Sequence, residues 1–205
     1  MRARLRGNVA WAAAAAFVGF AFISALVAIG ATRQLDRAIL DSLQPITTPW
    51  LDLVSSLLSA VGGVAVTSTA ALLLTVWWVA RRGLAGLTPL LMFIGSGIEV
   101  ILKRFIDHPP PPVDLLRDAH WLAIGGLGEG GSAFPSGHLV RTTFLAIVLV
   151  GQWPKLRPVA VALVTLMALS RVYSASHWTS DVIGGLCLGA GLGGVAVLID
   201  RRARP

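Results

Sequence analysis

Six long runs of apolar residues, separated by more polar segments of different lengths, make up most of the sequence. A helix needs about 20 apolar residues to cross a bilayer, and most of the runs come close to that length. Strands of a membrane barrel would alternate between apolar and polar positions, so these continuous runs predict helices. The predicted spans are residues 9–31, 64–80, 84–106, 138–152, 159–173 and 182–199, of which the fourth and fifth are short. We therefore expect an all-α, polytopic membrane protein with six transmembrane helices.

Two connections between the runs are long, residues 32–63 and residues 107–137. The first contains Leu35, Ile39 and Leu43 at helical spacing among charged residues, a pattern typical of a helix lying at the membrane surface. The second contains four consecutive prolines and a glycine-rich stretch, which favours a functional loop. We expect an interfacial helix in the first connection and an active-site loop in the second.

The composition supports one integral-membrane domain over residues 1–205. Apolar residues make up 55% of the chain and charged residues 13%, whereas soluble domains carry about 25% charged residues. A soluble fold and intrinsic disorder are therefore excluded, and the single Cys187 excludes a disulfide scaffold. The net charge of +7 does not indicate nucleic-acid binding, because the charges lie in short clusters between apolar runs.

The basic residues predict the orientation of the chain. If both termini are cytoplasmic, ten basic residues and one acidic residue lie on that side. The opposite side and its helix ends then carry seven basic and nine acidic residues, together with all four histidines and both long connections. We expect a cell-membrane protein whose active site is extracytoplasmic.

Three polar clusters fall at predicted helix ends on that side. They are Lys103, the segment 135–138 (Pro-Ser-Gly-His), and the group Arg171, His177 and Asp181. Each has an ordinary structural interpretation, since a lysine can extend to the lipid headgroups and Pro-Ser-Gly can form a turn and a helix cap. Ionisable groups that converge at one membrane face nevertheless indicate a functional site.

These residue types suit phosphoryl transfer. Lys103 and Arg171 supply positive charge, and the backbone N–H groups around Ser136 and Gly137 would form an anion seat at a helix N-terminus. Two imidazoles allow the nucleophile and the general acid to be different residues. Asp181 follows His177 by four positions, so on a helical turn its carboxylate could orient that imidazole. No cluster has metal-ligand spacing, so we expect neither a metal nor another cofactor.

The clusters resemble the signature of the type-2 phosphatidic acid phosphatase superfamily, which includes vanadium haloperoxidases. That signature is Lys-x6-Arg-Pro, then Pro-Ser-Gly-His, then Ser-Arg-x5-His-x3-Asp, and the second and third motifs match at every specified position. The resemblance implies that His177 is the nucleophile oriented by Asp181, and that His138 is the acid and base. It also implies that the phosphate is held by Lys103, Ser136, Gly137 and Arg171.

One position departs from this signature, because Pro110 stands where the family has arginine. Losing one such preorganised donor typically lowers the rate by about 10²–10³-fold. Arg141 follows His138 by three positions and could replace the missing ligand, and Arg104 or His108 are alternatives. The remaining alternative is an enzyme with little or no activity. Glu99, one turn before Lys103, is expected to form a structural ion pair.

The resemblance implies a lipid phosphatase acting on a phosphorylated lipid in the bilayer. Recycling of a polyprenyl diphosphate is the first expectation, and phosphatidylglycerol phosphate and phosphatidic acid are alternatives. A different class of function is binding or translocation of a phospholipid without hydrolysis. The small residues Gly185, Gly189 and Gly193 in the last run are expected to serve close packing within the chain.

Overall fold

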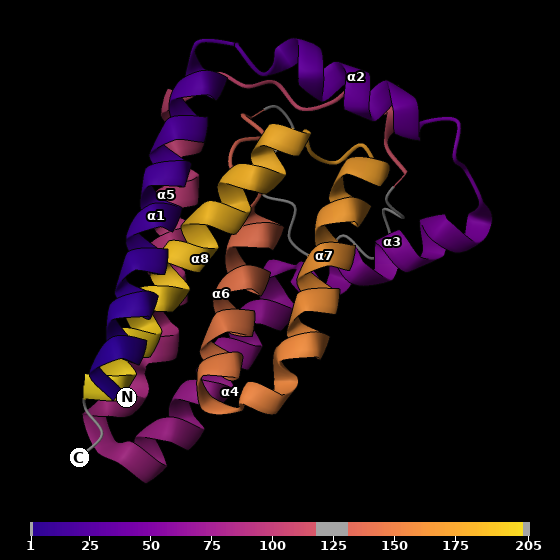
Figure 1. The fold of residues 1–205 in the computed structure, drawn as a ribbon. Coiled ribbons are helices and arrows are strands. Elements are labelled where there is room, and N and C mark those ends of the chain that lie inside the picture. Colours follow the sequence, from indigo (N-terminus) through magenta and orange to yellow (C-terminus); the bar gives the residue numbers. More distant parts are fainter. Residues whose placement is uncertain (1, 118–130, 203–205) are drawn as a thin grey trace.

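The structure is a computed structural model that describes residues 2–117 and 131–202. These residues form helices joined by turns and loops (Figure 1). Part of the expected active-site loop, residues 118–130, lies outside the described residues. The elements are α1 (Arg2–Ala28), α2 (Arg33–Leu43), α3 (Pro49–Gly62), α4 (Val64–Arg82), η1 (Gly83–Leu90), α5 (Leu91–Phe105), η2 (Val113–Leu115), α6 (Gly137–Gln152), η4 (Pro154–Leu156), α7 (Arg157–Tyr173) and α8 (Thr179–Arg202).

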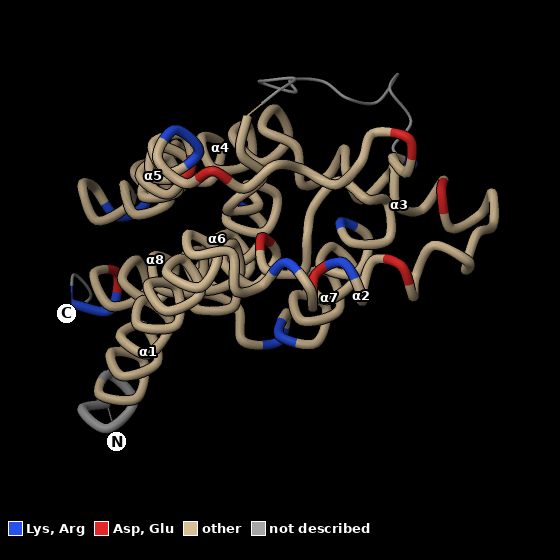
Figure 2. Tube along the Cα trace, turned by 90° about the horizontal axis from the view of Figure 1, so that it is seen from above, with Lys and Arg blue, Asp and Glu red and all other residues tan. Residues whose placement is uncertain are grey.

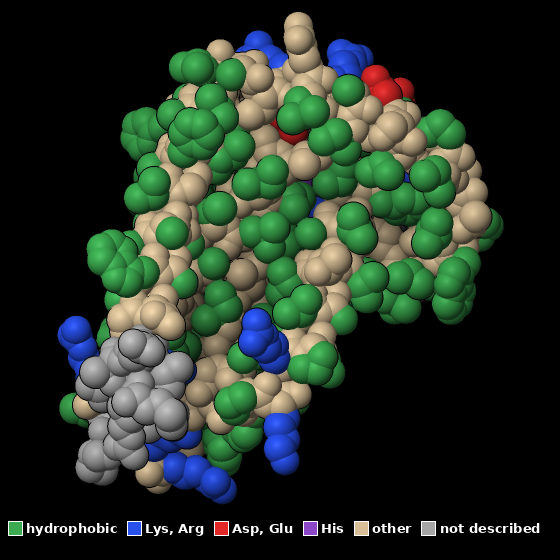
Figure 3. Space-filling view, in the orientation of Figure 1, with side chains coloured by type: hydrophobic (Ala, Val, Ile, Leu, Met, Phe, Trp, Pro, Cys, Tyr) green, Lys and Arg blue, Asp and Glu red, His purple; other side chains and the backbone are tan. Residues whose placement is uncertain are grey.

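Four helical segments of the described chain are long and apolar enough to cross a membrane. They are Gly7–Ala28, Val64–Phe105, Pro154–Tyr173 and Thr179–Arg202. The second has 42 residues, about twice what one crossing needs, and it comprises α4, η1 and α5. The shorter α6 is also apolar. Hydrophobic side chains cover much of the surface seen in Figure 3, while Lys and Arg gather toward its two ends.

The third predicted span is not one continuous α-helix. The run 84–106 was expected to be one helix, but α5 begins only at Leu91. Before it, η1 folds back onto α4, and Gly86 lies directly against the backbone of Trp78 and Val79. A glycine is needed there because a Cβ would collide with that backbone. The sequence did not predict this turn because it is as apolar as the helix that follows it.

The first long connection contains more structure than the sequence predicted. The expected surface helix is present as α2, but α3 was not predicted. A local signal for α3 exists, since the Thr48 hydroxyl accepts a hydrogen bond from the Leu51 N–H at 3.2 Å and Pro49 opens the helix. This missed helix contacts α7 and α6 and contributes to the site described below.

The three apolar residues expected on one face of α2 have different surroundings. Ile39 and Leu43 pack partly buried against the protein core, whereas Leu35 is 65% exposed. The most buried residues of α2 are Leu40 and Asp36. The Asp36 carboxylate accepts hydrogen bonds from the backbone N–H and the hydroxyl of Ser180 at 2.8 and 2.7 Å. Asp36 therefore caps the first turn of α8, and this contact turns the side of α2 that carries Asp36 toward the bundle.

Helix α8 lies at the centre of the bundle, between α1 and α6 (Figure 1). Gly185 and Gly189 lie against the backbone carbonyls of Ser136 and Val140, and Gly193 lies against α6 one turn further on. The expectation of close packing within the chain is confirmed for this stripe. The absence of side chains along it lets α6 and α8 approach closely.

The bundle carries few charges along its helices, as the view from above in Figure 2 illustrates. One polar group, centred on the buried Asp200, joins the ends of α4, α6 and α8. Arg82 forms an ion pair with Asp200 at 3.0 Å and donates to the Gln152 side chain, which in turn donates to Asp200. The polar residues of the candidate site lie at the opposite end of these helices.

Candidate active site

The turn that precedes α6 joins the start of α8. Ser136 is the N-cap residue of α6, and its backbone N–H donates to the Asp181 carbonyl at 3.0 Å. The first N–H groups of a helix have no acceptor within the helix and carry its positive dipole end. The Ser136 hydroxyl is buried and has no hydrogen-bond partner among the described residues. This end of α6 therefore offers several donors to an anion.

The rings of His138 and His177 face each other at this end of α6. Their centroids are 6.4 Å apart and the rings meet edge to face. His138 is the second residue of α6, and its ring hydrogen-bonds the backbone of Ser59 in α3. His177 lies in the turn between α7 and α8. The two imidazoles are close enough for one phosphoryl group to contact both.

Asp181 is fully buried and contacts the ring of His177. Its carboxylate lies 3.4 Å from Nδ1 of His177 and accepts the Trp178 backbone N–H at 2.9 Å. The contact does not form on a helical turn as expected, because His177 precedes α8 and the third residue of the helix reaches back to it. Nε2, the other ring nitrogen of His177, is not engaged in this contact.

His108 approaches the other carboxylate oxygen of Asp181. Its Nε2 lies 3.4 Å from Asp181 Oδ1 and 3.4 Å from the Ser180 hydroxyl. The sequence suggested His108 as a substitute phosphate ligand, but here the ring contacts the carboxylate that also contacts His177. Asp36 joins the same group through Ser180. The spacing of the motifs did not predict that His108 or Asp36 would lie beside Asp181.

Glu99 connects the two cations Lys103 and Arg141. Its carboxylate forms ion pairs with Lys103 at 2.9 Å and with Arg141 at 3.0 Å, and Arg141 also donates to the Gly62 carbonyl at 3.4 Å. The same carboxylate lies against the Cα of Gly137, where a Cβ would collide with it. The expected ion pair of Glu99 is present, and it includes Arg141 as well as Lys103.

Arg171 is 1% exposed and directed toward α3. Its guanidinium donates to the Ser59 hydroxyl at 2.7 Å and to the Ser55 carbonyl at 3.0 Å. The missed helix α3 thus contacts both Arg171 and His138. Serines at positions 55 and 59, four residues apart in a mainly apolar stretch, were the available signal.

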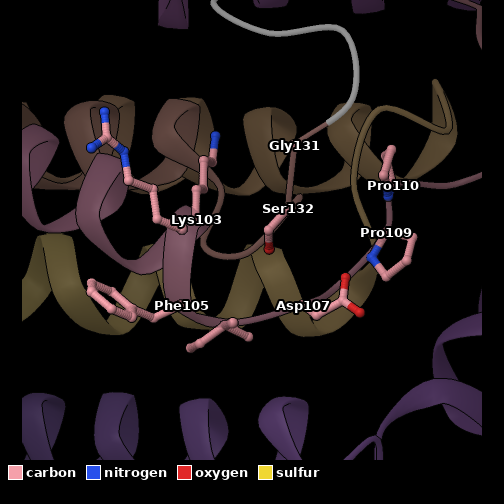
Figure 4. Close-up of a pocket in the computed structure, with 9 residues that line it drawn as sticks. Lys103, Phe105, Asp107, Pro109, Pro110, Gly131 and Ser132 are labelled. Carbon is pink, nitrogen blue, oxygen red and sulfur yellow. The ribbon is translucent and has the colours of Figure 1, made fainter.

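A pocket of about 490 Å³ opens beside Lys103 at the end of α5 (Figure 4). Its lining includes Arg104, Asp107 and Pro110, but neither His138 nor His177. Arg104 is exposed on this side. In the parts of the chain that the structure describes, no group of three or more His, Cys, Asp or Glu side chains is arranged to hold a metal ion.

This combination of two facing imidazoles, a carboxylate behind one of them and cations at a helix N-terminus fits phosphoryl transfer. The sequence of residues 84–205 matches the PAP2 superfamily. The chain belongs to this family. A solved transmembrane PAP2-type phosphatidylglycerolphosphate phosphatase from Bacillus subtilis has the same fold, with a TM-score of 0.76 over 95% of this chain and 98% of that one, at 23% identity.

Curated relatives of this PAP2 protein carry phosphatase names. The chain is 35% identical over 119 residues to a decaprenylphosphoryl-5-phosphoribose phosphatase of Mycobacterium tuberculosis, and the match covers 58% of each protein. It is 27% identical over 187 residues to phosphatidylglycerophosphatase B of Bacillus subtilis, covering 84% of this chain and 87% of that protein. The match with the mycobacterial relative thus spans little more than half of that relative's length.

Proposed function

We propose that this PAP2 protein is a metal-independent lipid phosphatase that removes a terminal phosphate through a phosphohistidine intermediate. The observation that carries the proposal is the pair of facing imidazoles, 6.4 Å apart at the N-terminus of α6, with the Asp181 carboxylate behind His177. Two imidazoles on one phosphoryl group separate attack from proton transfer.

In the first step, Nε2 of His177 attacks phosphorus while the bond from phosphorus to the lipid oxygen breaks. His138 in its protonated form gives its proton to that oxygen. In the second step, the now neutral His138 takes a proton from water, the water oxygen attacks phosphorus, and the phosphorus–nitrogen bond breaks. The lipid, now lacking its terminal phosphate, leaves after the first step, and inorganic phosphate leaves after the second. Asp181 keeps His177 oriented throughout.

The charge that develops on the phosphoryl oxygens requires donors fixed in advance. We assign this role to Lys103, Arg171, the Ser136 hydroxyl and the backbone at Gly137. Arg141 is assigned to replace the arginine that Pro110 displaces, because it is buried beside Lys103 through the shared Glu99 carboxylate. Arg104 is the alternative, since it lies with Pro110 on the pocket.

The substrate proposed is a membrane lipid with a terminal phosphate or diphosphate. The names of the two relatives describe phosphatases for a phosphorylated ribose on a polyprenyl phosphate and for phosphatidylglycerophosphate. They favour a phosphate monoester, whereas the sequence alone placed a polyprenyl diphosphate first. Both chemical classes therefore belong in the test.

The proposed topology has six spans, namely α1, α4, α5 with part of η1, α6, α7 and α8. The termini and the Arg82–Asp200 group then face the cytoplasm, and the histidines face the extracytoplasmic side of the cell membrane. The positive-inside distribution of the sequence supports this orientation, as does the position of Lys103, His138, His177 and Asp181 at one end of the bundle.

The test is a substrate panel with purified protein in detergent, comparing wild type with His177→Ala. The panel contains a polyprenyl diphosphate, phosphatidylglycerol phosphate, phosphatidic acid and a phosphorylated sugar on a polyprenyl phosphate. We expect phosphate release that EDTA leaves unchanged, and an acid-labile, base-stable phosphoenzyme that His177→Ala lacks. Loss of activity with EDTA would overturn the metal-independent mechanism. Tight lipid binding without release would favour the transport or binding function.

A further inference from the structure

Glu99 is a buried acid that the mechanism proposed above does not use. It lies in α5, one turn before Lys103, and is only 8% exposed. Its two carboxylate oxygens are divided between two cations, with Oε1 on Lys103 and Oε2 on Arg141. These partners come from α5 and α6, so the ion pairs join two helices at the end where the histidines lie.

The carboxylate also lies next to the proposed anion seat. It contacts the Cα of Gly137, the first residue of α6. Because Cα–Cβ bonds tilt toward the N-terminus of a helix, the space that a Cβ would take at Gly137 lies on the side from which an anion approaches. A phosphate bound at this terminus would therefore share Lys103 and Arg141 with a second negative group.

Two opposite effects follow from this arrangement. The carboxylate holds the two cations in place and compensates for their mutual repulsion in a poorly hydrated interior. Its own charge also repels a phosphate that binds nearby. The first effect assists the reaction, and the second lowers the affinity of the site for every phosphate, including the inorganic phosphate that must leave after each turnover.

We propose that Glu99 is a positioning residue that sets Lys103 and Arg141 for the phosphoryl group and keeps the product weakly bound. The inference rests on the proposed function for the location of the phosphate. It goes further in giving the buried carboxylate a defined effect on product release. If the Glu99 ion pairs were merely structural, removing the carboxylate charge would lower the folding stability of the protein but would not strengthen its binding of phosphate.

The test is the affinity of the purified protein for inorganic phosphate, measured by calorimetry without any lipid substrate. Glu99→Gln keeps the shape and two polar atoms but removes the charge. We expect it to bind phosphate roughly tenfold more tightly than wild type, because one nearby repulsive charge is gone. In hydrolysis assays the same variant should show stronger inhibition by phosphate.

Asp200→Asn is the matched control. Asp200 is also buried, at 4% exposure, and pairs with an arginine at 3.0 Å, but it lies at the opposite end of the bundle. The control removes an equivalent charge and shares the cost in stability. Its affinity for phosphate should equal that of wild type, and tightening in this variant too would overturn the proposal.

Glu99→Asp provides a second measurement if Glu99→Gln does not fold. The shorter side chain keeps the charge but draws Lys103 and Arg141 away, so kcat should fall while phosphate affinity does not increase. An unchanged or weaker phosphate affinity in Glu99→Gln, or a tighter one in Glu99→Asp, would contradict the role. Wild type that binds phosphate but hydrolyses no lipid would instead contradict the proposed function.

Discussion

The backbone N–H of Ser136 donates a hydrogen bond to the carbonyl oxygen of Asp181 over 3.0 Å. This bond joins the turn just before α6, whose second residue is His138, to the first turn of α8, which carries the carboxylate beside His177. Gly185 makes the contact possible, because it lies directly against the Ser136 carbonyl and the Leu139 side chain. The relative position of the two histidines therefore depends on backbone contacts between α6 and α8.

Gly185→Ala tests this dependence. The new Cβ would meet the Leu139 Cβ at 2.8 Å, and overpacking of this kind costs about 1–3 kcal/mol. We expect a lower Tm and a loss of kcat/KM of roughly tenfold or more, since a small shift in reacting groups can cost about 10²-fold. Gly97→Ala is the control, because a Cβ at Gly97 meets nothing within 4 Å. Equal activity in the two variants would contradict the prediction.

Asp181→Asn should distinguish the orientation of the His177 ring from the binding of phosphate. The amide oxygen can still accept the Trp178 N–H, but the charge that favours one tautomer of His177 and stabilises its cation is lost. We expect kcat to fall by roughly 10²–10⁴-fold, by analogy with other carboxylate–histidine pairs. Phosphate affinity measured by calorimetry should change little. Near-normal phosphoenzyme formation in rapid-quench experiments would show that the carboxylate does not orient the nucleophile.

Arg141→Ala tests the replacement for the missing arginine. We expect a loss of about 10²–10³-fold in kcat, the usual effect of removing one preorganised donor. Arg82→Ala is matched to it, because each removes an arginine paired with a buried acid at 3.0 Å. Among folded variants, Arg141→Ala should lower kcat and Arg82→Ala should not. Hydrolysis at the wild-type level in Arg141→Ala would transfer the role to Arg104.

Asp36→Asn tests the capping of α8 by α2. Asp36 accepts two hydrogen bonds from Ser180, and an amide can accept only through its single oxygen. A hydrogen bond to a charged group contributes about 1.5–3 kcal/mol, which corresponds to a Tm lowered by about 3–12 °C for a chain of this size. Asp41→Asn, an exposed change on the same helix, should leave Tm unchanged. A similar Tm for both variants would contradict the capping role.

Much of the helical fold was predictable from the apolar runs. The bounds of α6 and α7 agree with the sequence to within two residues, because transitions between apolar and polar composition coincide with their ends. The two elements that the sequence did not predict, η1 and α3, were missed for the same reason. Hydrophobicity indicates whether a segment lies in lipid, in the protein core or in water, but it does not indicate the backbone conformation. The turn η1 is apolar except for Thr88. Helix α3 is mainly apolar, but its 14 residues are fewer than a membrane span needs.

The residues of the candidate site that belong to the sequence motifs could be predicted from the sequence. His138, His177 and Asp181 come together as their helix ends implied, and their catalytic roles remain predictions. The partners that hold them come from distant segments that spacing cannot relate. Ser59 lies 112 positions from Arg171 and Asp36 lies 144 from Ser180, so only the packing of α3 and α2 reveals these contacts.

Helix α2 runs across the end of the bundle and is joined to the start of α8 through Asp36 (Figure 1). In the proposed topology this helix would rest among the phospholipid headgroups. Lateral pressure or a changed surface charge there would act on α2, whose Asp36 is hydrogen-bonded to the residue just before Asp181. Turnover should then respond to the lipid composition of the surrounding leaflet even when the substrate itself stays the same.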